Sequence, residues 1–206
     1  LGDQEENDPV NNFNYVWNDV NETYGPFCVK NIDWEEIYHI YSANLNENST
    51  DAELYEAVKG ILGELYDNHV AFIPTDPAFP FFQSGILGEL KTFEDFDLEI
   101  IKQNYLTDFT QKDYEFSYGL LENNIAYVHL SHVSAGIKNT EKFFDEVFDK
   151  YKDTDGMIID LRNNSGGDDK ESVYIAGRFS NRTTDAFGFR LKDGPGPDDY
   201  TPFYYY

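Results

Sequence analysis

The segment 157–170 sets the apolar run MIIDL directly before RNNSGGDDK. A short apolar run bounded by turn residues is typical of a buried strand, and the acidic residues at its end are typical of a helix start. Two consecutive glycines cost backbone entropy and supply no side chain for packing. The sequence therefore predicts that another group approaches this backbone closely.

Strands and helices alternate on both sides of this segment. IAYVHL, residues 125–130, has the pattern of a strand, and Asn139 or Thr140 is expected to cap a helix that ends near Tyr151. The apolar spacing of residues 173–179 predicts another helix after the glycines. This order favours an α/β fold with a largely parallel sheet and right-handed crossovers.

The first 66 residues have helical periodicity instead. Pro9 is expected to open a helix that stops at Gly25-Pro26. Capping-box patterns at Asp33 and Thr50 predict two more helices, with apolar stripes suited to packing on one another.

The change of pattern predicts the domain boundaries. VAFI, residues 70–73, resembles a short strand, and the proline-rich residues 74–82 forbid a long helix. We expect an N-terminal helical region over 1–75, a connecting segment over 76–117 with a short helix within 93–106, and an α/β core over 118–206.

Charge and composition exclude several classes of partner. The chain has 206 residues, of which 40% are hydrophobic, so it can build a packed core. Its net charge of −24 argues against nucleic-acid and anionic-membrane partners. No run approaches the roughly 20 apolar residues of a transmembrane segment. Cys28 is the single cysteine, so an intrachain disulfide is impossible.

The glycine loop has two interpretations. In an α/β sheet, ligands bind beyond the carboxyl ends of the strands, where RNNSGG falls. A glycine N–H there, beside a helix N-terminus, can stabilise an oxyanion. The alternative is a tight strand-to-helix turn in which Asn and Asp residues serve only as caps.

The same residues carry a resemblance to a known family. MIIDLRNNSGG is similar to the D-L-R-x-N-x-G-G segment of the tail-specific, or C-terminal processing, serine peptidases. LGELYDNHVAFI, residues 62–73, is similar to the L-x-D-x-H segment of their tricorn-like branch, and residues 13–27 and 33–41 resemble its helical region. The resemblance covers most of residues 11–180, and the family also includes the interphotoreceptor retinoid-binding protein.

The resemblance implies a fold, a reaction and site residues. It implies a ClpP/crotonase-like α/β core behind an N-terminal helical bundle, in a serine-type endopeptidase that acts on peptides or proteins through an acyl-enzyme without a cofactor. His69 would be the general base, Gly167 would offer its amide to the oxyanion, and Gly166 would support the turn. The short connecting segment matches members without a PDZ module, which implies an extracytoplasmic location in the periplasm or cell envelope, with a lipid anchor as one option.

Two departures from the family pattern qualify this prediction. Only 39 residues follow Gly167, and they contain no small-residue segment like the one that holds the family's catalytic serine. We therefore expect a chain that is incomplete at the C-terminus and inactive as given, with its nucleophile beyond residue 206. Asn68 stands before His69 where relatives often have Ser or Gly, so the orienting partner of His69 stays open.

Other polar residues have simpler interpretations. Ser165 lacks a nucleophile-elbow motif and an adjacent His, so we do not expect it to be the nucleophile. HVSAG, residues 132–136, is expected to be a strand end and loop. His129 and His132 should face opposite sides of a strand, so we expect no shared metal. Asp193, Asp198 and Asp199 suggest a solvated turn rather than a calcium loop. Asp160 and Arg162 suit an ion pair that holds the loop.

Two functional alternatives remain open. The retinoid-binding relative implies that the same fold can bind a ligand or peptide without cleaving it. The aromatic tail TPFYYY could instead dock a partner protein.

Overall fold

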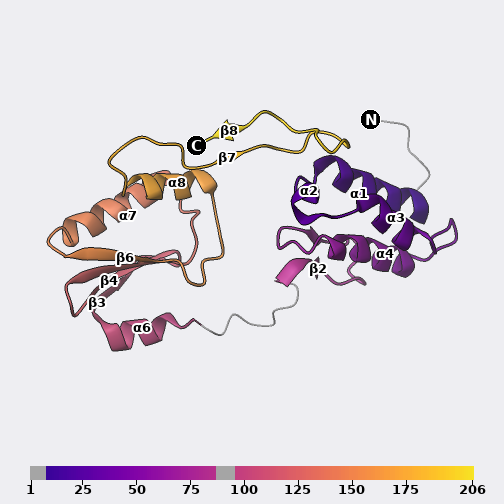
Figure 1. Cartoon of the computed structure of the whole chain (residues 1–206). Helices are drawn as coiled ribbons and strands as arrows, with labels where there is room; N and C mark the ends of the chain where they lie inside the picture. The colour runs from indigo at the N-terminus through magenta and orange to yellow at the C-terminus, as the bar shows by residue number, and fades with distance from the viewer. Residues whose placement is uncertain (1–7, 87–95) are drawn as a thin grey trace. The chain divides into compact units, whose positions relative to one another are not determined.

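The computed structural model describes residues 8–86 and 96–206, which lie in two compact units (Figure 1). The helical unit comprises residues 1–91 and 189–204, and the sheet unit comprises residues 92–188 and 205–206.

The helical unit contains the predicted helices and one that the sequence did not reveal. Its elements are α1 (Pro9–Thr23), α2 (Phe27–Lys30), α3 (Trp34–Ser42), α4 (Asp51–Glu64) and the antiparallel pair β1 (Ala71–Phe72) and β2 (Phe82–Gln83). Asp33 and Thr50 each accept a hydrogen bond from the amide three residues on, and Thr50 forms the full capping box with Glu53, whereas Asp33 shows only the N-cap bond. The single turn α2 is too short to show periodicity.

Apolar stripes from three helices form the core of the helical unit. Phe13 of α1, Trp34 of α3 and Ile61 of α4 are all buried there. The indoles of Trp17 and Trp34 stack at 6.3 Å, and each donates its Nε1–H to the other residue's carbonyl at 3.1 Å. These reciprocal hydrogen bonds fix α1 against the start of α3.

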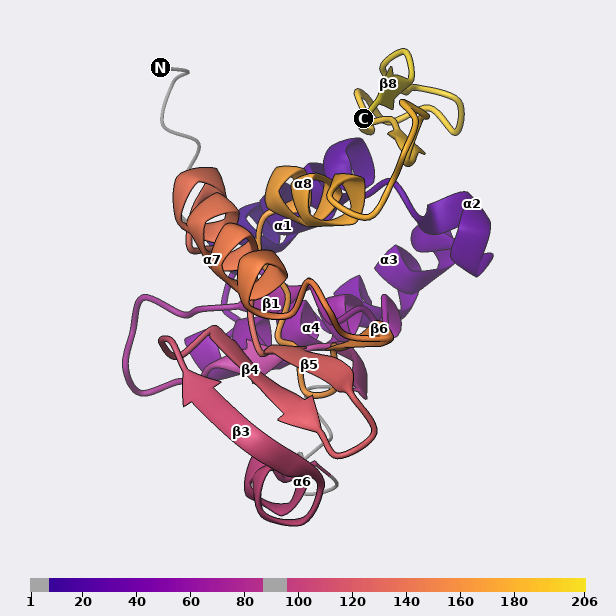
Figure 2. The ribbon, with the colours of Figure 1, turned by 90° about the vertical axis from the view of Figure 1, so that its left-hand side faces the viewer.

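The sheet unit is a four-stranded sheet with three helices. Its elements are α6 (Leu98–Tyr105), β3 (Leu106–Gln111), β4 (Phe116–Leu121), β5 (Ile125–Leu130), α7 (Ile137–Lys150), β6 (Gly156–Asp160) and α8 (Asp169–Gly177). The strand order is β3-β4-β5-β6, and α7 and α8 lie on one face of the sheet (Figures 1 and 2). The chain therefore has the predicted α/β fold, and the segment 76–117 supplies α6, β3 and the start of β4 to this unit.

The expectation of a largely parallel sheet is wrong. Only β5 and β6 are parallel, whereas β3, β4 and β5 pair antiparallel. Short turns join β3 to β4 and β4 to β5, and such turns allow only antiparallel neighbours. The α7 crossover is long enough to return the chain to a parallel strand.

The start of α7 also differs from the prediction. The helix begins at Ile137 with Gly136 as its N-cap, before Asn139 and Thr140. Asn139 donates its side-chain amide to the Ala135 carbonyl at 2.8 Å, and the Thr140 hydroxyl bonds to Glu171. Both predicted caps are therefore engaged elsewhere.

The last described elements are β7 (Gly188–Phe189) and β8 (Tyr204–Tyr205), where the boundary between the two units falls. Between these strands, the Tyr200 hydroxyl bonds to the Gly25 carbonyl of the helical unit. Within residues 8–86 and 96–206, no helix has both the length and the apolar character needed to cross a bilayer.

Candidate active site

Two loops meet at the carboxyl ends of the parallel strands β5 and β6. Loop 131–136 follows β5, and loop 161–168 follows β6. Backbone hydrogen bonds join them, from Ser165 N to Ser131 O at 3.0 Å, from Val133 N to Gly166 O at 2.9 Å, and from Asp168 N to Val133 O at 2.7 Å. The loops therefore continue the pairing of the two strands toward α8.

The glycines accommodate a close approach within this pair of loops. Gly166 and Gly167 have φ angles of +102° and +144°. A Cβ at position 167 would lie 1.9 Å from the Val133 carbonyl oxygen, whereas one at position 166 would meet nothing within 4 Å. The group that approaches the double glycine is thus the Val133 backbone. Position 167 requires glycine because its φ angle is positive and because the Val133 carbonyl fills the space of a side chain.

The Gly167 amide of the loop stays available. Gly166 donates its N–H to Asn164 Oδ1 at 2.8 Å, and Asp168 donates to the Val133 carbonyl. Among the residues that the structure describes, the exposed Gly167 N–H has no hydrogen-bond acceptor. An unpaired N–H just before a helix N-terminus can bind an anionic oxygen.

An ion pair anchors the start of the loop. Arg162 donates Nη2–H to Asp160 Oδ2 at 2.5 Å, and the Tyr127 hydroxyl donates to the same oxygen at 2.7 Å. Burial opposes ionisation of Asp160, but these hydrogen bonds prevail and lower its pKa to about 2. The predicted Asp160–Arg162 pair is confirmed.

The fold gives Ser165 a histidine neighbour that is absent from its sequence context. His132 Nδ1 lies 2.9 Å from Ser165 Oγ, although the residues are 33 positions apart. His129 points elsewhere, with Nε2 at 3.0 Å from the Arg162 carbonyl. The statement that Ser165 has no adjacent His holds for the sequence and is wrong for the structure.

His69 lies in the helical unit, in the turn between α4 and β1. Its side chain is 99% exposed, with Nδ1 at 3.7 Å from Asp67 Oδ1. Asp67 also accepts hydrogen bonds from the His69 amide at 2.9 Å and the Tyr24 hydroxyl at 2.7 Å. Burial would raise the pKa of Asp67, but these hydrogen bonds and Lys30 together lower it.

Asp67 is therefore the candidate orienting partner that sequence reasoning left open. The D-x-H spacing is the signal that could have identified it. The structure brings Gly166, Gly167, Ser165 and His132 together in the sheet unit, and His69 belongs to the helical unit.

Comparisons with known proteins match both units. Residues 124–194, which include both loops, match the model of Peptidase family S41, and residues 6–63 match the Tricorn protease C1 domain. A crystal structure described as a "putative peptidase" from Parabacteroides merdae is 27% identical, with a TM-score of 0.80 over 98% of this chain. These matches support an S41 tail-specific, tricorn-like peptidase family for this chain. It spans 62% of that structure's chain, and no curated protein matches it.

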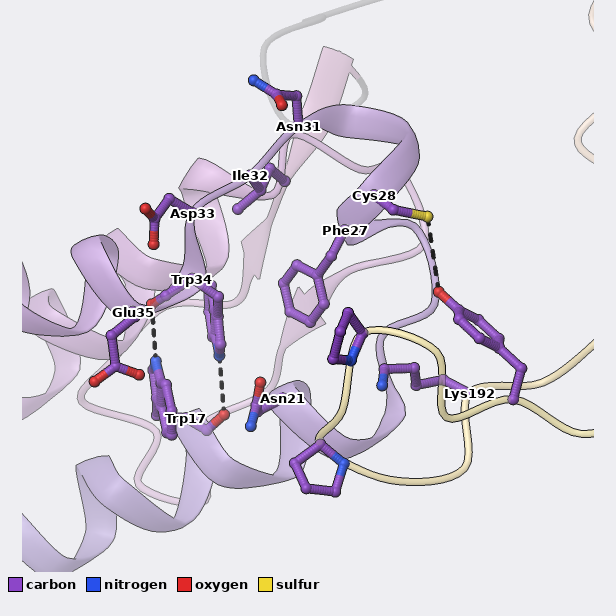
Figure 3. Close-up of a pocket in the computed structure, with 13 residues that line it drawn as sticks. Trp17, Asn21, Phe27, Cys28, Asn31, Ile32, Asp33, Trp34, Glu35 and Lys192 are labelled. Carbon is purple, nitrogen blue, oxygen red and sulfur yellow. Dashed lines mark hydrogen bonds between the residues drawn. The ribbon is translucent and has the colours of Figure 1, made fainter.

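A cavity of about 580 Å³ lies in the helical unit (Figure 3). Trp17, Phe27 and Trp34 line it together with residues of the returning segment 192–200. Lys192 also lines it, but its amine is engaged by the carbonyls of Gly194 and Gly196. The lining therefore combines four aromatic side chains with polar residues such as Asn21, Asp33 and Glu35.

The chemistry available to these residues follows from their contacts. Gly167 can donate one hydrogen bond to a developing oxyanion. Asp67 lies beside one ring nitrogen of His69 and leaves the other nitrogen exposed, where it can accept a proton from a reacting group.

Proposed function

We propose that this chain is part of a serine-type endopeptidase of the tail-specific, tricorn-like class. The single observation that carries the proposal is the unpaired N–H of Gly167, on a loop within the S41 match. In acyl transfer, removal of one such donor typically costs about 10²–10³ in rate.

The proposal assigns a role to each group. His69 would take the proton from a serine hydroxyl as that oxygen attacks the peptide carbonyl, and would return it to the leaving amine. Gly167 would donate its N–H to the carbonyl oxygen as that oxygen gains negative charge. Gly166 would support the turn, and Asp67 would orient the imidazole. We place the serine outside the 206 residues given.

A labelling experiment on the product of the complete coding sequence tests this proposal. We expect a fluorophosphonate to label the protein, and His69→Ala to abolish labelling. His39→Ala is the matched control, because His39 is also exposed and also lies 3.7 Å from a carboxylate, that of Glu35. Labelling that persists in the His69→Ala protein would remove His69 from the mechanism.

The aromatic cavity of the helical unit favours a second candidate function, the binding of a hydrophobic ligand without cleavage. Both tryptophans of the chain line this cavity, so intrinsic fluorescence reports on it directly. A complete protein that hydrolyses no peptide and whose tryptophan emission shifts with an apolar ligand would favour the binder. Hydrolysis without such a shift would favour the peptidase.

A further inference from the structure

Two buried carboxylates lie against loop 131–136, and the proposed reaction uses neither of them. Glu115 precedes β4, and Glu171 is in the first turn of α8. They are only 3% and 2% exposed. Burying a carboxylate costs free energy unless hydrogen-bond donors contact it. The donors around each of these two carboxylates therefore indicate which segments the carboxylate holds in place.

Glu115 holds the middle of the loop. Its carboxylate accepts hydrogen bonds from the Ser134 amide at 2.9 Å, the Ser134 hydroxyl at 3.1 Å and the Tyr114 hydroxyl at 2.6 Å. Its backbone carbonyl accepts from the Ser131 amide at 2.9 Å. Burial would raise the pKa of Glu115, but these donors and nearby His132 lower it, so the group stays an ionised acceptor.

Glu171 holds the end of the same loop. Its carboxylate accepts hydrogen bonds from the Gly136 amide at 2.8 Å and from the Thr140 hydroxyl. Gly136 is the N-cap of α7, while Glu171 lies on α8, the helix that follows Gly167. This carboxylate therefore ties the start of one helix to the start of the other.

Val133 lies between Ser131 and Ser134, which Glu115 holds. Its N–H and carbonyl bond to Gly166 and Asp168, the two residues that flank Gly167. Its carbonyl also occupies the space where a side chain at position 167 would lie. The path from each carboxylate to the free amide consists only of main-chain atoms and short hydrogen bonds.

We propose that Glu115 and Glu171 are positioning residues that fix loop 131–136 and, through the Val133 backbone, set the direction of the Gly167 N–H. The catalytic meaning of this inference rests on the proposed function, in which that N–H donates a hydrogen bond to the oxyanion. A glutamine at either position keeps the shape but turns one acceptor oxygen into an NH₂ donor, which would face an N–H or O–H donor.

Amide hydrogen exchange on the 206-residue chain tests the structural part. In Glu115→Gln and in Glu171→Gln we expect the Val133 and Asp168 amides to exchange at least 10-fold faster, while the amides inside β5 change less than 2-fold. The control is Asp108→Asn on β3, a carboxylate that accepts the Tyr151 hydroxyl at 3.2 Å and has no contact with the loop. We expect it to leave Val133 and Asp168 unchanged.

Steady-state kinetics of the complete protein test the catalytic part. Both glutamine variants should lower kcat at least 10-fold with KM within 2-fold, because a misdirected amide weakens binding of the transition state more than binding of the substrate. Asp108→Asn should leave both constants unchanged.

Three results would overturn the positioning role. They are unchanged exchange at Val133 and Asp168, equal acceleration throughout β5, which would mean general destabilisation, and an effect on KM alone. A protein that hydrolyses no peptide but shows the local exchange change would contradict the proposed function and leave the positioning of the amide supported.

Discussion

Gly166 and Gly167 both have positive φ angles, but they differ in what a side chain would meet. Alanine at position 166 incurs only backbone strain, about 1–2 kcal/mol. Alanine at position 167 also collides with the Val133 carbonyl, so its loop must shift, which adds about 1–3 kcal/mol.

We therefore predict that Gly167→Ala lowers the free energy of unfolding by about 2 kcal/mol more than Gly166→Ala. Urea unfolding followed by circular dichroism measures the difference. An equal loss of unfolding free energy in the two variants would show that the Val133 carbonyl does not clash with a side chain at position 167.

Asp160 gives the loop a pH dependence with a definite sign. Its folded-state pKa is lowered to about 2, below the ordinary aspartate value of about 3.9. The ionised group therefore stabilises the fold fully above about pH 4, and this contribution is lost as the pH falls toward 2.

Asp160→Asn should cost about 1–2 kcal/mol at pH 7, because the hydrogen bonds from Arg162 and Tyr127 lose their charged acceptor. The difference in free energy of unfolding between the unsubstituted protein and Asp160→Asn should become smaller as the pH falls from about 4 to about 2. A difference that stays constant over that range would be inconsistent with an ionised Asp160 in the fold.

At the scale of single elements, α4 shows which features the sequence specifies locally. Thr50 Oγ1 accepts a hydrogen bond from the Glu53 amide at 3.3 Å, and Glu53 Oε2 accepts from the Thr50 amide at 2.7 Å. Thr50→Ala should lower the stability of the helical unit by about 1 kcal/mol, since it removes one half of this capping box.

Thermal unfolding should show this loss for Thr50→Ala and a smaller one for Thr50→Ser, which keeps the hydroxyl. If alanine and serine behave alike, the cap does not stabilise α4.

The start of α7 shows where local patterns fail. Asn139 and Thr140 are good capping residues in sequence, but their side chains are engaged by Ala135 and by Glu171. The competing contact from Glu171 comes from another helix, so no window of sequence around α7 contains it. The prediction of a largely parallel sheet was wrong because the direction of neighbouring strands depends on the turns before and after β4.

At the scale of the whole molecule, sequence motifs identified the double-glycine loop and its flanking strand and helix, and they nominated His69. They did not reveal the contact of His132 with Ser165, or the buried roles of Glu115 and Glu171. The His132–Ser165 and Gly136–Glu171 contacts join residues 33 and 35 positions apart, beyond the ends of the parallel strands β5 and β6. The Glu115–Ser134 contacts join residues 19 positions apart, beside the antiparallel pair of β4 and β5. Such pairings are set by tertiary packing and leave no periodic signal.

In the proposed reaction, Gly167 presents a free N–H to a reacting carbonyl oxygen. A crystal structure of the complete protein after reaction with a fluorophosphonate tests it most directly. We expect a phosphoryl oxygen about 2.7–3.1 Å from the Gly167 nitrogen. A phosphoryl oxygen held by other donors, with the Gly167 N–H bonded to the protein itself, would contradict it.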